Sequence, residues 1–256
     1  MLKSFINEAL KKIGYEIQRT SQSSSKMPIE LGKAEREIIR YVMSNKLTMV
    51  SQERLFTTAM ACKYVIERGI DGDFVECGVW RGGNAIVAAQ IFKLYNSNKK
   101  VWLFDTFKGM TTPTDIDLVA LSGKAAKHQF KAEQKETHNE WCYASLQDVR
   151  NNFFKLGLAE DIFFIQGDVC QTLDSKSSQL PIIISVLRLD TDWFESTKKE
   201  LEFLYPKLSL NGCLIIDDYG HWFGAKKATD EYFKKHGNRP FLQYTDYTGR
   251  AGIKTF

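Results

Sequence analysis

The chain has 256 residues, 43% of them hydrophobic and 26% charged, which is an ordinary composition for a globular protein with a substantial core. Its 35 lysines and arginines against 31 acidic residues give a net charge of +4, too balanced to indicate a nucleic-acid-binding protein. No apolar stretch approaches the roughly 20 residues of a membrane-spanning helix, and the N-terminus lacks the unbroken apolar core of a signal peptide. We therefore expect a globular protein that neither binds nucleic acid nor spans a membrane.

The five cysteines indicate neither a disulfide framework nor a structural zinc site. Their number is odd, and no two of them are spaced as C-x-x-C. We expect all five to be small buried hydrophobic side chains in a protein of the reducing cytoplasm. They are Cys62, Cys77, Cys142, Cys170 and Cys213.

Residues 1–20 predict an amphipathic helix, because apolar residues recur at helical spacing and several lysines occupy the other positions. One interpretation is a helix on the inner membrane surface, held by apolar insertion and anionic lipid. The other is a helix packed on the body or on a second subunit of a homo-oligomer, which we favour slightly because two glutamates dilute the positive charge. The polar stretch 21–26 separates this segment, residues 1–27, from a domain of residues 28–256.

The rest of the chain alternates between helical and strand patterns. After two predicted helices, strands and helices take turns from Asp73 onward, which argues for parallel βαβ units with right-handed crossovers. The stretch 241–256 instead predicts a hairpin. The fold class is therefore α/β, a doubly wound, mostly parallel sheet that ends with an antiparallel strand. The predicted strands are 73–77, 101–105, 162–166, 182–189 and 213–217, and the predicted helices are 34–45, 51–68, 83–95, 144–156, 194–206 and 224–235.

A long polar insertion, residues 108–143, interrupts this alternation. A long insertion after a strand is commonly a lid or a binding loop, and the alternative is a disordered surface excursion. Trp141 and Tyr143 at the end of the insertion favour partial packing on the domain.

A glycine-rich turn follows the first predicted strand. Its pattern, Glu76-x-Gly78-x-x-x-Gly82-Gly83, lets the backbone turn tightly, but it is neither the G-x-G-x-x-G of dinucleotide enzymes nor a Walker loop. Glu76 would repel a pyrophosphate and attract a cationic cofactor such as S-adenosylmethionine. Asp105 closes the next strand, where an acid suits ribose hydroxyls. The alternative is a tight turn without a ligand.

Three aspartates end two neighbouring strands late in the chain: Asp190, Asp217 and Asp218. Carboxylates that meet at one crevice repel each other unless a cation or a proton lies between them. Mg²⁺ is the default for such an oxygen site, with Ca²⁺ and Mn²⁺ left open, and the absence of a paired-histidine motif lowers the case for zinc. The alternative for Asp217 and Asp218 is a helix cap or a turn.

Two residues compete for the role of general base. Asp192 lies two positions after Asp190, and its alternative role is to cap the helix predicted from residue 194. His221 is the competing base, because the pKa of a histidine is naturally closer to neutrality.

These motifs, in this order, resemble the macrocin O-methyltransferase (TylF-like) family over roughly residues 28–256. The stretch from 108 to 143 matches the family pattern least. The matching stretches are Thr48-Met49 with Arg54-Leu55, GDFVECGVWRGGN (72–84), LFDTFKGM (103–110), LRLDTDWFEST (187–197), LYPKLSLNGCLIIDDYGHWFGAKKATDEYF (204–233) and DYTGRAGIK (246–254).

The resemblance implies a Rossmann-like class I methyltransferase fold, S-adenosylmethionine as the methyl donor and a divalent cation, usually Mg²⁺. It implies Asp190, Asp217 and Asp218 as metal ligands and Asp192 as the base. The residues that it assigns to the cofactor are Thr48, Glu76, Gly78, Arg81, Gly82, Asn84, Asp105 and Asp168.

The function that we expect is Mg²⁺-dependent methylation of a hydroxyl on a sugar or a phenolic small molecule. The metal would lower the pKa of the hydroxyl, and Asp192 would take its proton. The alternatives are a metal-independent small-molecule methyltransferase, a non-catalytic S-adenosylmethionine-binding protein and, least favoured, a nicotinamide dehydrogenase. If the helix over residues 1–20 lies on a membrane, we expect the substrate to be a lipid-linked sugar or a surface polysaccharide precursor.

Overall fold

The computed structural model describes residues 27–158, 160–175 and 180–256. The chain divides into two compact units, residues 1–36 and residues 37–256, and each is described by itself. In the first unit, the Arg36 guanidinium donates hydrogen bonds to the carbonyl oxygens of Pro28 and Leu31. Both of these residues precede helix α2 (Lys33–Ser44). The helix expected over residues 1–20 lies outside the described residues, and the division at residue 27 stays a prediction.

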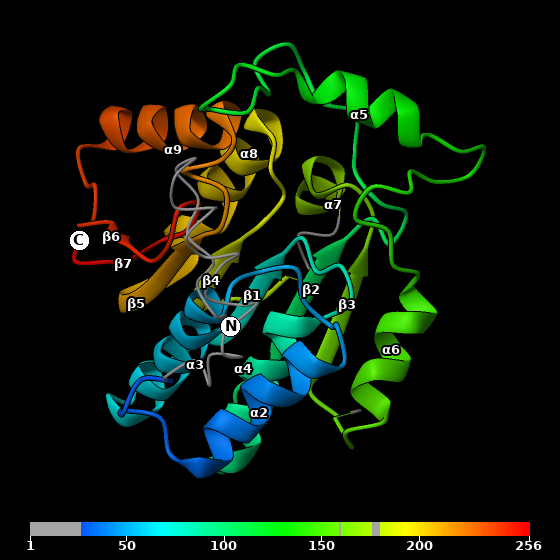
Figure 1. Cartoon of the computed structure of the whole chain (residues 1–256). Helices are drawn as coiled ribbons and strands as arrows, with labels where there is room; N and C mark the ends of the chain where they lie inside the picture. Colours follow the sequence, from blue (N-terminus) through cyan, green and yellow to red (C-terminus); the bar gives the residue numbers. More distant parts are fainter. Residues whose placement is uncertain (1–26, 159, 176–179) are drawn as a thin grey trace, which may run out of the picture. The chain divides into compact units, whose positions relative to one another are not determined.

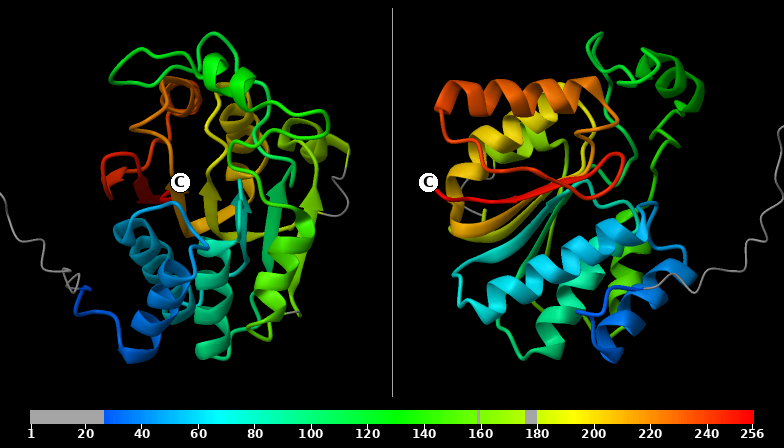
Figure 2. Two further views of the ribbon diagram at one scale, coloured as in Figure 1. Left: turned by 45° about the vertical axis from the view of Figure 1, so that its right-hand side comes forward. Right: turned by 60° about the vertical axis from the view of Figure 1, so that its left-hand side comes forward.

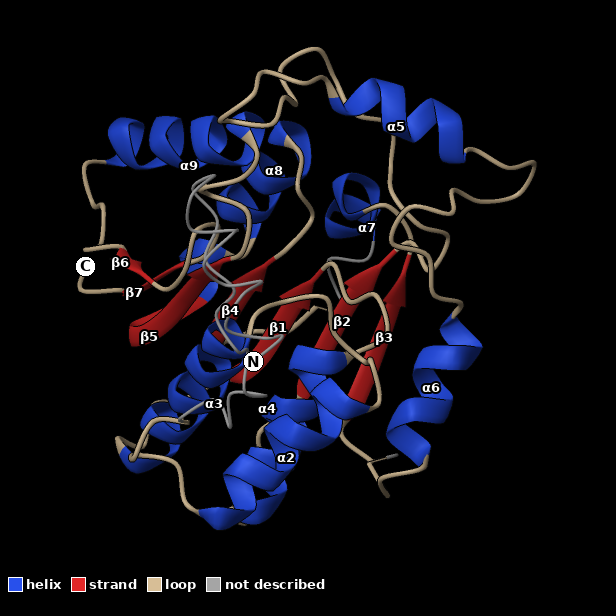
Figure 3. Cartoon of the chain, viewed as in Figure 1, coloured by secondary structure: helices blue, strands red, loops and turns tan. Residues whose placement is uncertain are grey.

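The second unit is built on a seven-stranded sheet in the order β3-β2-β1-β4-β5-β7-β6. The first five of these strands run parallel, whereas β7 pairs antiparallel with both β5 and β6 (Figure 3). The predicted α/β sheet with an antiparallel end is thus confirmed. The strands are β1 (Asp73–Cys77), β2 (Val101–Asp105), β3 (Ile162–Gln166), β4 (Ile184–Leu189), β5 (Leu208–Ile216), β6 (Gln243–Tyr244) and β7 (Arg250–Ile253).

Helices cover both faces of the sheet. Helices α3 and α4 pack together on one face, and α8 and α9 pack together on the other (Figure 2). Because both faces are covered, every residue of β4 is buried, which explains its continuous apolar run. Besides residues 37–44 of α2 and the short 3-10 helix η2 (Tyr205–Lys207), the described helices of this unit are α3 (Gln52–Glu67), α4 (Gly83–Leu94), α5 (Ala126–Glu133), α6 (Leu146–Phe154), α7 (Val169–Ser175), α8 (Phe194–Phe203) and α9 (Phe223–His236).

The insertion is structured, as its tryptophan suggested. It contains helix α5 and lies beyond the carboxyl ends of the strands (Figure 1). Isolated β-bridges join Leu118 to Ala125 within it and Val119 to Trp222 at the start of α9. The insertion is therefore fastened to the body of the unit.

The order of the strands indicates where a ligand-binding crevice lies in the sheet. Strand β1 lies between β2 and β4, so the chain winds outward from β1 in both directions, and ligands bind at the carboxyl ends of strands around such a reversal. The glycine turn follows β1, Asp105 ends β2, and Asp190 and Asp217 directly follow β4 and β5.

Two further observations concern the whole unit. Among the described helices, none is long and apolar enough to cross a membrane.

The five cysteines are free thiols, of which Cys62, Cys77 and Cys213 are buried and the other two are half-buried. The expectation that all five are buried therefore holds for three of them.

Candidate active site

A cavity of about 470 Å³ opens at the carboxyl ends of the strands. It brings together ten of the residues that the sequence singled out. From the cofactor set these are Thr48, Glu76, Gly78, Asn84 and Asp105, and from the acid set they are Asp190, Asp192, Asp217 and Asp218 with His221.

The glycines allow the loop after β1 to approach its neighbours closely. Gly78 has φ +82°, and a Cβ there would lie 1.9 Å from the Asp190 carbonyl oxygen, so the ends of β1 and β4 meet at a distance that only glycine permits. Gly82 has φ +89° and precedes the first turn of α4. A Cβ at Gly82 would lie 2.8 Å from the Phe153 ring, so this glycine serves packing.

Asp105 organises the loop around the cofactor side of the cavity. Its carboxylate accepts hydrogen bonds from the backbone N–H groups of Val79 (2.7 Å), Trp80 (3.2 Å) and Phe107 (2.6 Å). Burial nevertheless raises the pKa of Asp105. Its carboxylate thus holds the turns after β1 and β2 together.

Glu76 offers a free acceptor in the same cavity. Its Oε1 accepts a hydrogen bond from Arg188 Nη1 at 2.7 Å, whereas its buried Oε2 has no partner among the residues that the structure describes. Burial raises the pKa of Glu76 to about 7. A buried carboxyl oxygen without a partner is costly, so a ligand that donates a hydrogen bond or carries positive charge fits here.

Three residues of the expected cofactor set do not line this cavity. The Arg81 guanidinium bonds Asp148 and the Lys46 carbonyl oxygen, each at 3.0 Å. Asp168 lines a smaller adjoining cavity of about 60 Å³, together with Gly78 and Asp105. The third is Gly82.

Carboxylates gather at the other side of the large cavity. One oxygen from each of Asp190, Asp192 and Asp218 lies within 4.8 Å of the others. Burial and mutual repulsion raise the pKa values of Asp190 and Asp218 well above the ordinary value for an aspartate. The buried Oδ2 of Asp218 has no hydrogen-bond partner within the described ranges. Such a group of oxygens fits a hard divalent cation.

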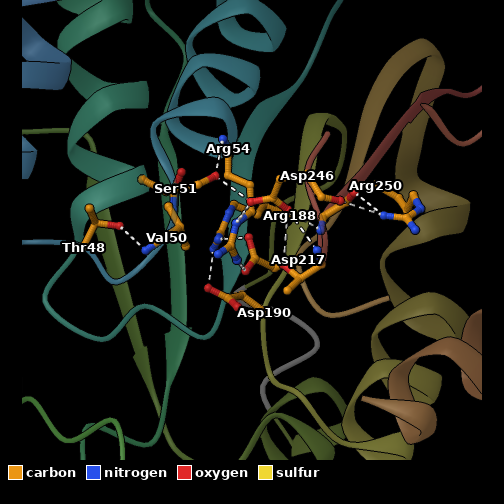
Figure 4. Close-up of polar contacts among 12 residues, drawn as sticks. Thr48, Val50, Ser51, Arg54, Arg188, Asp190, Asp217, Asp246 and Arg250 are labelled. Carbon is orange, nitrogen blue, oxygen red and sulfur yellow. Dashed lines mark hydrogen bonds and ion pairs between the residues drawn. The ribbon is translucent and has the colours of Figure 1, made fainter. Parts of the chain in front are cut away.

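Asp217 is placed differently from the other acids. Both of its carboxylate oxygens are hydrogen-bonded to arginines, one to Arg54 and one to Arg188 (Figure 4). Arg188 also bonds Asp190 Oδ2 at 2.7 Å, and Arg54 bonds Asp246 Oδ2 at 2.9 Å. Two guanidinium groups thus alternate with the carboxylates of the crevice.

The role of these arginines was not predicted from the sequence, although both lie in stretches that carried the resemblance. A usable signal existed for Arg188, which is the one charged residue of β4 (ISVLRL). A charged side chain in a fully buried strand needs a charged partner, and Arg188 is only 1% exposed. Of its three partners, Asp190 lies two residues further along the chain, but Asp217 and Glu76 lie 29 and 112 residues away, which sequence spacing does not reveal.

Both candidate bases line the cavity. Burial and the neighbouring Asp190 raise the pKa of Asp192 to about 7, and a hydrogen bond from Asp218 acts in the opposite direction. Burial and the charge of Arg54 lower the pKa of His221, whose Nδ1 lies 3.4 Å from the Tyr247 hydroxyl. Either group can thus accept a proton near neutral pH.

The family model described as Macrocin-O-methyltransferase (TylF) matches residues 3–251. The chain belongs to this family. The match begins within the N-terminal segment that we had expected to lie outside the resemblance.

Relatives and a solved structure agree with the family. A tetracenomycin-C rhamnosyl 4'-O-methyltransferase of Streptomyces olivaceus is 32% identical over 79% of this chain and 73% of its own length. The demethyldecarbamoylnovobiocin O-methyltransferase of Streptomyces niveus is 35% identical over 75% and 70%. The structure of the O-methyltransferase NovP aligns with a TM-score of 0.69 at 32% identity and covers 82% of both chains.

The expected class I methyltransferase fold is therefore confirmed, and so is the expected activity class. The chain is an S-adenosylmethionine-dependent O-methyltransferase of the macrocin O-methyltransferase family.

Proposed function

We propose that the acceptor is a hydroxyl on a sugar, in a glycan or a glycosylated natural product, or on a phenolic small molecule. The observation that carries this proposal is the carboxylate group of Asp190, Asp192 and Asp218 in the same cavity as the cofactor residues. The names of two relatives, a rhamnosyl tetracenomycin-C 4'-O-methyltransferase and a mycinamicin III 3''-O-methyltransferase, support a glycosylated acceptor. Trp141 and Trp222 line the cavity, and aromatic side chains of this kind can pack against a sugar.

S-adenosylmethionine supplies an electrophilic methyl group on a sulfonium. We propose that the chain binds it with Thr48, Gly78, Asn84 and Asp105 and with the unpartnered Oε2 of Glu76. Arg81 and Gly82 support this set from outside the cavity by fixing the turn before α4, and Asp168 borders the smaller cavity.

A divalent cation, Mg²⁺ by default, supplies a Lewis acid that lowers the pKa of the acceptor hydroxyl. Asp190 and Asp218 fit it best, because their carboxylate oxygens lie close together and the buried Oδ2 of Asp218 has no partner among the described residues. Asp217 stays the proposed third ligand from the family resemblance. Its carboxylate must release a contact with Arg54 or Arg188 before it can take that role.

We propose Asp192 as the general base. Its carboxylate oxygen lies within 4.8 Å of oxygens of both Asp190 and Asp218, so it is within reach of a hydroxyl held beside them. Its raised pKa of about 7 suits a base that works near neutral pH. His221 is the alternative, on the same cavity wall.

A methyl-transfer assay tests the proposal. The purified chain is incubated with labelled S-adenosylmethionine and a panel of rhamnosides, other glycosides and catechols, with Mg²⁺ or with EDTA. We expect transfer that EDTA abolishes and Mg²⁺ restores. Transfer that is unaffected by EDTA would instead indicate a metal-independent methyltransferase. No transfer to any acceptor, despite cofactor binding in calorimetry, would contradict the proposed acceptor classes.

Substitutions separate the roles of the acids. Asp190→Asn and Asp218→Asn should lose Mg²⁺ binding in calorimetry, whereas Asp192→Asn should keep it and lose turnover by about 100-fold or more, the usual contribution of a general base. Asp174→Asn is the control, because that carboxylate is exposed and pairs with Lys199. Full turnover of Asp192→Asn would transfer the role of base to His221.

Partners and location stay predictions as well. We propose a cytoplasmic enzyme that forms a homo-oligomer, which light scattering of the full chain would test. Liposome flotation of the full chain against a chain that starts at Pro28 would test membrane contact through residues 1–20, and equal flotation would remove that idea.

A further inference from the structure

Asp117, in the insertion, is a fully buried carboxylate that lines neither cavity. Its Oδ2 accepts hydrogen bonds from the backbone N–H (2.7 Å) and the hydroxyl (2.8 Å) of Thr114. Its Oδ1 accepts a hydrogen bond at 2.8 Å from the backbone N–H of Phe194, the first residue of α8. Trp193, at the N-cap position, offers no side-chain cap, so an aspartate 77 residues away serves as the cap.

The same carboxylate lies against the first turn of α9. A Cβ on Gly224 would come within 2.0 Å of Asp117 Oδ1, so the approach requires glycine at this position. Backbone hydrogen bonds from Phe223 N–H to the Leu118 oxygen (2.9 Å) and from Ala120 N–H to the His221 oxygen (2.7 Å) lie on either side. The insertion is thus anchored at the starts of two helices, where the partial positive charges of both helix dipoles favour a carboxylate.

These anchors lie next to the acid group of the active site. Asp192 precedes Phe194 by two residues and has φ +68°, a left-handed conformation that aspartate tolerates better than most non-glycine residues but still adopts at a cost. The indole N–H of Trp193, between them, donates to the Thr111 oxygen of the insertion at 3.0 Å. The Trp222 side chain lines the same cavity as Asp192.

Trp193, Trp222 and Trp141 of the insertion form one cluster, the aromatic wall, with ring centroids 5.0 to 5.9 Å apart. We propose that Asp117 is a positioning residue for methyl transfer: by fastening the insertion to the first turns of α8 and α9, it holds the Asp192 turn and the aromatic wall in place. This inference rests on the proposed function, because it assigns Asp117 an effect on the proposed base and cation site. The insertion is then a fixed wall of the acceptor site.

Three substitutions test this role in the full-length chain. Asp117→Ala removes the cap, Asp117→Asn keeps an acceptor for Phe194 but loses one for Thr114, and Gly224→Ala pushes Asp117 away while leaving it in the sequence. We expect Asp117→Ala and Gly224→Ala to weaken Mg²⁺ binding in calorimetry about tenfold, as for the loss of one buried hydrogen bond. Asp117→Asn should lie between these variants and the wild type. Affinity for S-adenosylmethionine should change by less than about twofold in all three.

The tryptophans give a second readout. Near-ultraviolet circular dichroism should lose intensity in Asp117→Ala and Gly224→Ala, because the aromatic wall loosens. Asp115→Ala is the matched control, an exposed carboxylate of the same segment that pairs with Lys127, and it should change neither readout.

Two results would overturn the inference. One is unchanged Mg²⁺ affinity and an unchanged near-ultraviolet spectrum in folded variants. The other is an equal loss of affinity for Mg²⁺ and for S-adenosylmethionine, which would indicate general destabilisation. If the wild type binds no Mg²⁺, the cation part of the proposed function fails, and the near-ultraviolet spectrum alone decides the role of Asp117.

Discussion

At the scale of single residues, one buried acidic side chain on α8 is expected to link the stability of the chain to pH. Glu200, on α8, is fully buried, and its Oε1 accepts a hydrogen bond at 2.8 Å from the hydroxyl of Thr191, which lies between Asp190 and Asp192. Its Oε2 is buried and has no partner in the part of the chain that the structure describes. Burial raises the pKa of Glu200 from 4.5 to about 8, so the native state holds this proton more tightly than the unfolded chain.

We expect Glu200 to make stability depend on pH. Between about pH 4.5 and pH 8 the unfolded chain has lost the proton and the folded one keeps it, so the free energy of unfolding falls as pH rises through this range. Glu200→Gln cannot ionise and should show a shallower slope, because other buried acids such as Glu76 and Asp192 also have raised pKa values. The variant should match the wild type near pH 5 and exceed it by a few kcal/mol at pH 8, since one pKa unit corresponds to about 1.4 kcal/mol.

Urea unfolding at pH 5, 6.5 and 8 measures this difference. Glu195→Gln, an exposed carboxylate on the same helix, is the control and should follow the wild type at every pH. A Glu200→Gln variant with the same pH slope as the wild type would show that Glu200 does not hold the proton.

At the scale of secondary-structure elements, the decisive contact is the one between the ends of β1 and β4. Asp190 N–H donates to the Cys77 oxygen at 2.8 Å, and the next residue, Gly78, lies directly against the Asp190 carbonyl. The cofactor turn and the first acid of the cation group are therefore one rigid unit.

Gly78→Ala should disrupt this unit. The new Cβ would lie 1.9 Å from the Asp190 oxygen, and alanine is also unfavourable at φ +82°. We expect loss of measurable S-adenosylmethionine binding in calorimetry and a drop of at least about 3 kcal/mol in the free energy of unfolding, as is usual for severe overpacking combined with backbone strain.

Gly237→Ala is the matched control for this substitution. Gly237 has φ +66° at the end of α9, but a Cβ there would have nothing within 4 Å. It should cost about 1 kcal/mol, the backbone contribution alone, and leave cofactor binding intact. If both variants behaved alike, strain at positive φ and not the β1–β4 contact would explain the result.

The sequence predicted the secondary-structure elements better than it predicted the contacts between side chains. Strands β1, β2 and β3 match the expected ranges because each is a short apolar run between clear breaks. Strand β5 begins at Leu208 and not at residue 213, because Asn211-Gly212 resembles a turn although it continues the strand. Helix α7 was not predicted, since it has only seven residues; its signal was Asp168, whose Oδ1 accepts a hydrogen bond from Cys170 N–H.

At the scale of the whole molecule, the large cavity has a charge opposite to that of the chain. The chain carries a net charge of +4, yet the cavity is lined by six acidic residues against Arg54, Lys124 and one histidine. Two guanidinium groups, Arg54 and Arg188, compensate part of that charge from α3 and β4. The remaining carboxylates favour the entry of a cation from solvent.

We therefore expect Mg²⁺ to stabilise the folded state. A ligand at 100 times its Kd adds about 2.7 kcal/mol, which for a chain of this size corresponds to a rise in Tm of roughly 5–10 °C. Thermal unfolding with Mg²⁺ and with EDTA measures the effect. Asp218→Asn should abolish the rise and Asp174→Asn should keep it; a rise that survives in Asp218→Asn would place the cation elsewhere.

The five free thiols have a practical consequence for labelling. Burial raises the pKa of every one of them, to about 12 for Cys170 and Cys213, so almost no thiolate is present at neutral pH. Maleimides react with the thiolate and should leave the native chain largely unmodified. A cysteine introduced at an exposed position of the insertion could then carry a single fluorophore without removal of any native cysteine, which opens the insertion to distance measurements during turnover.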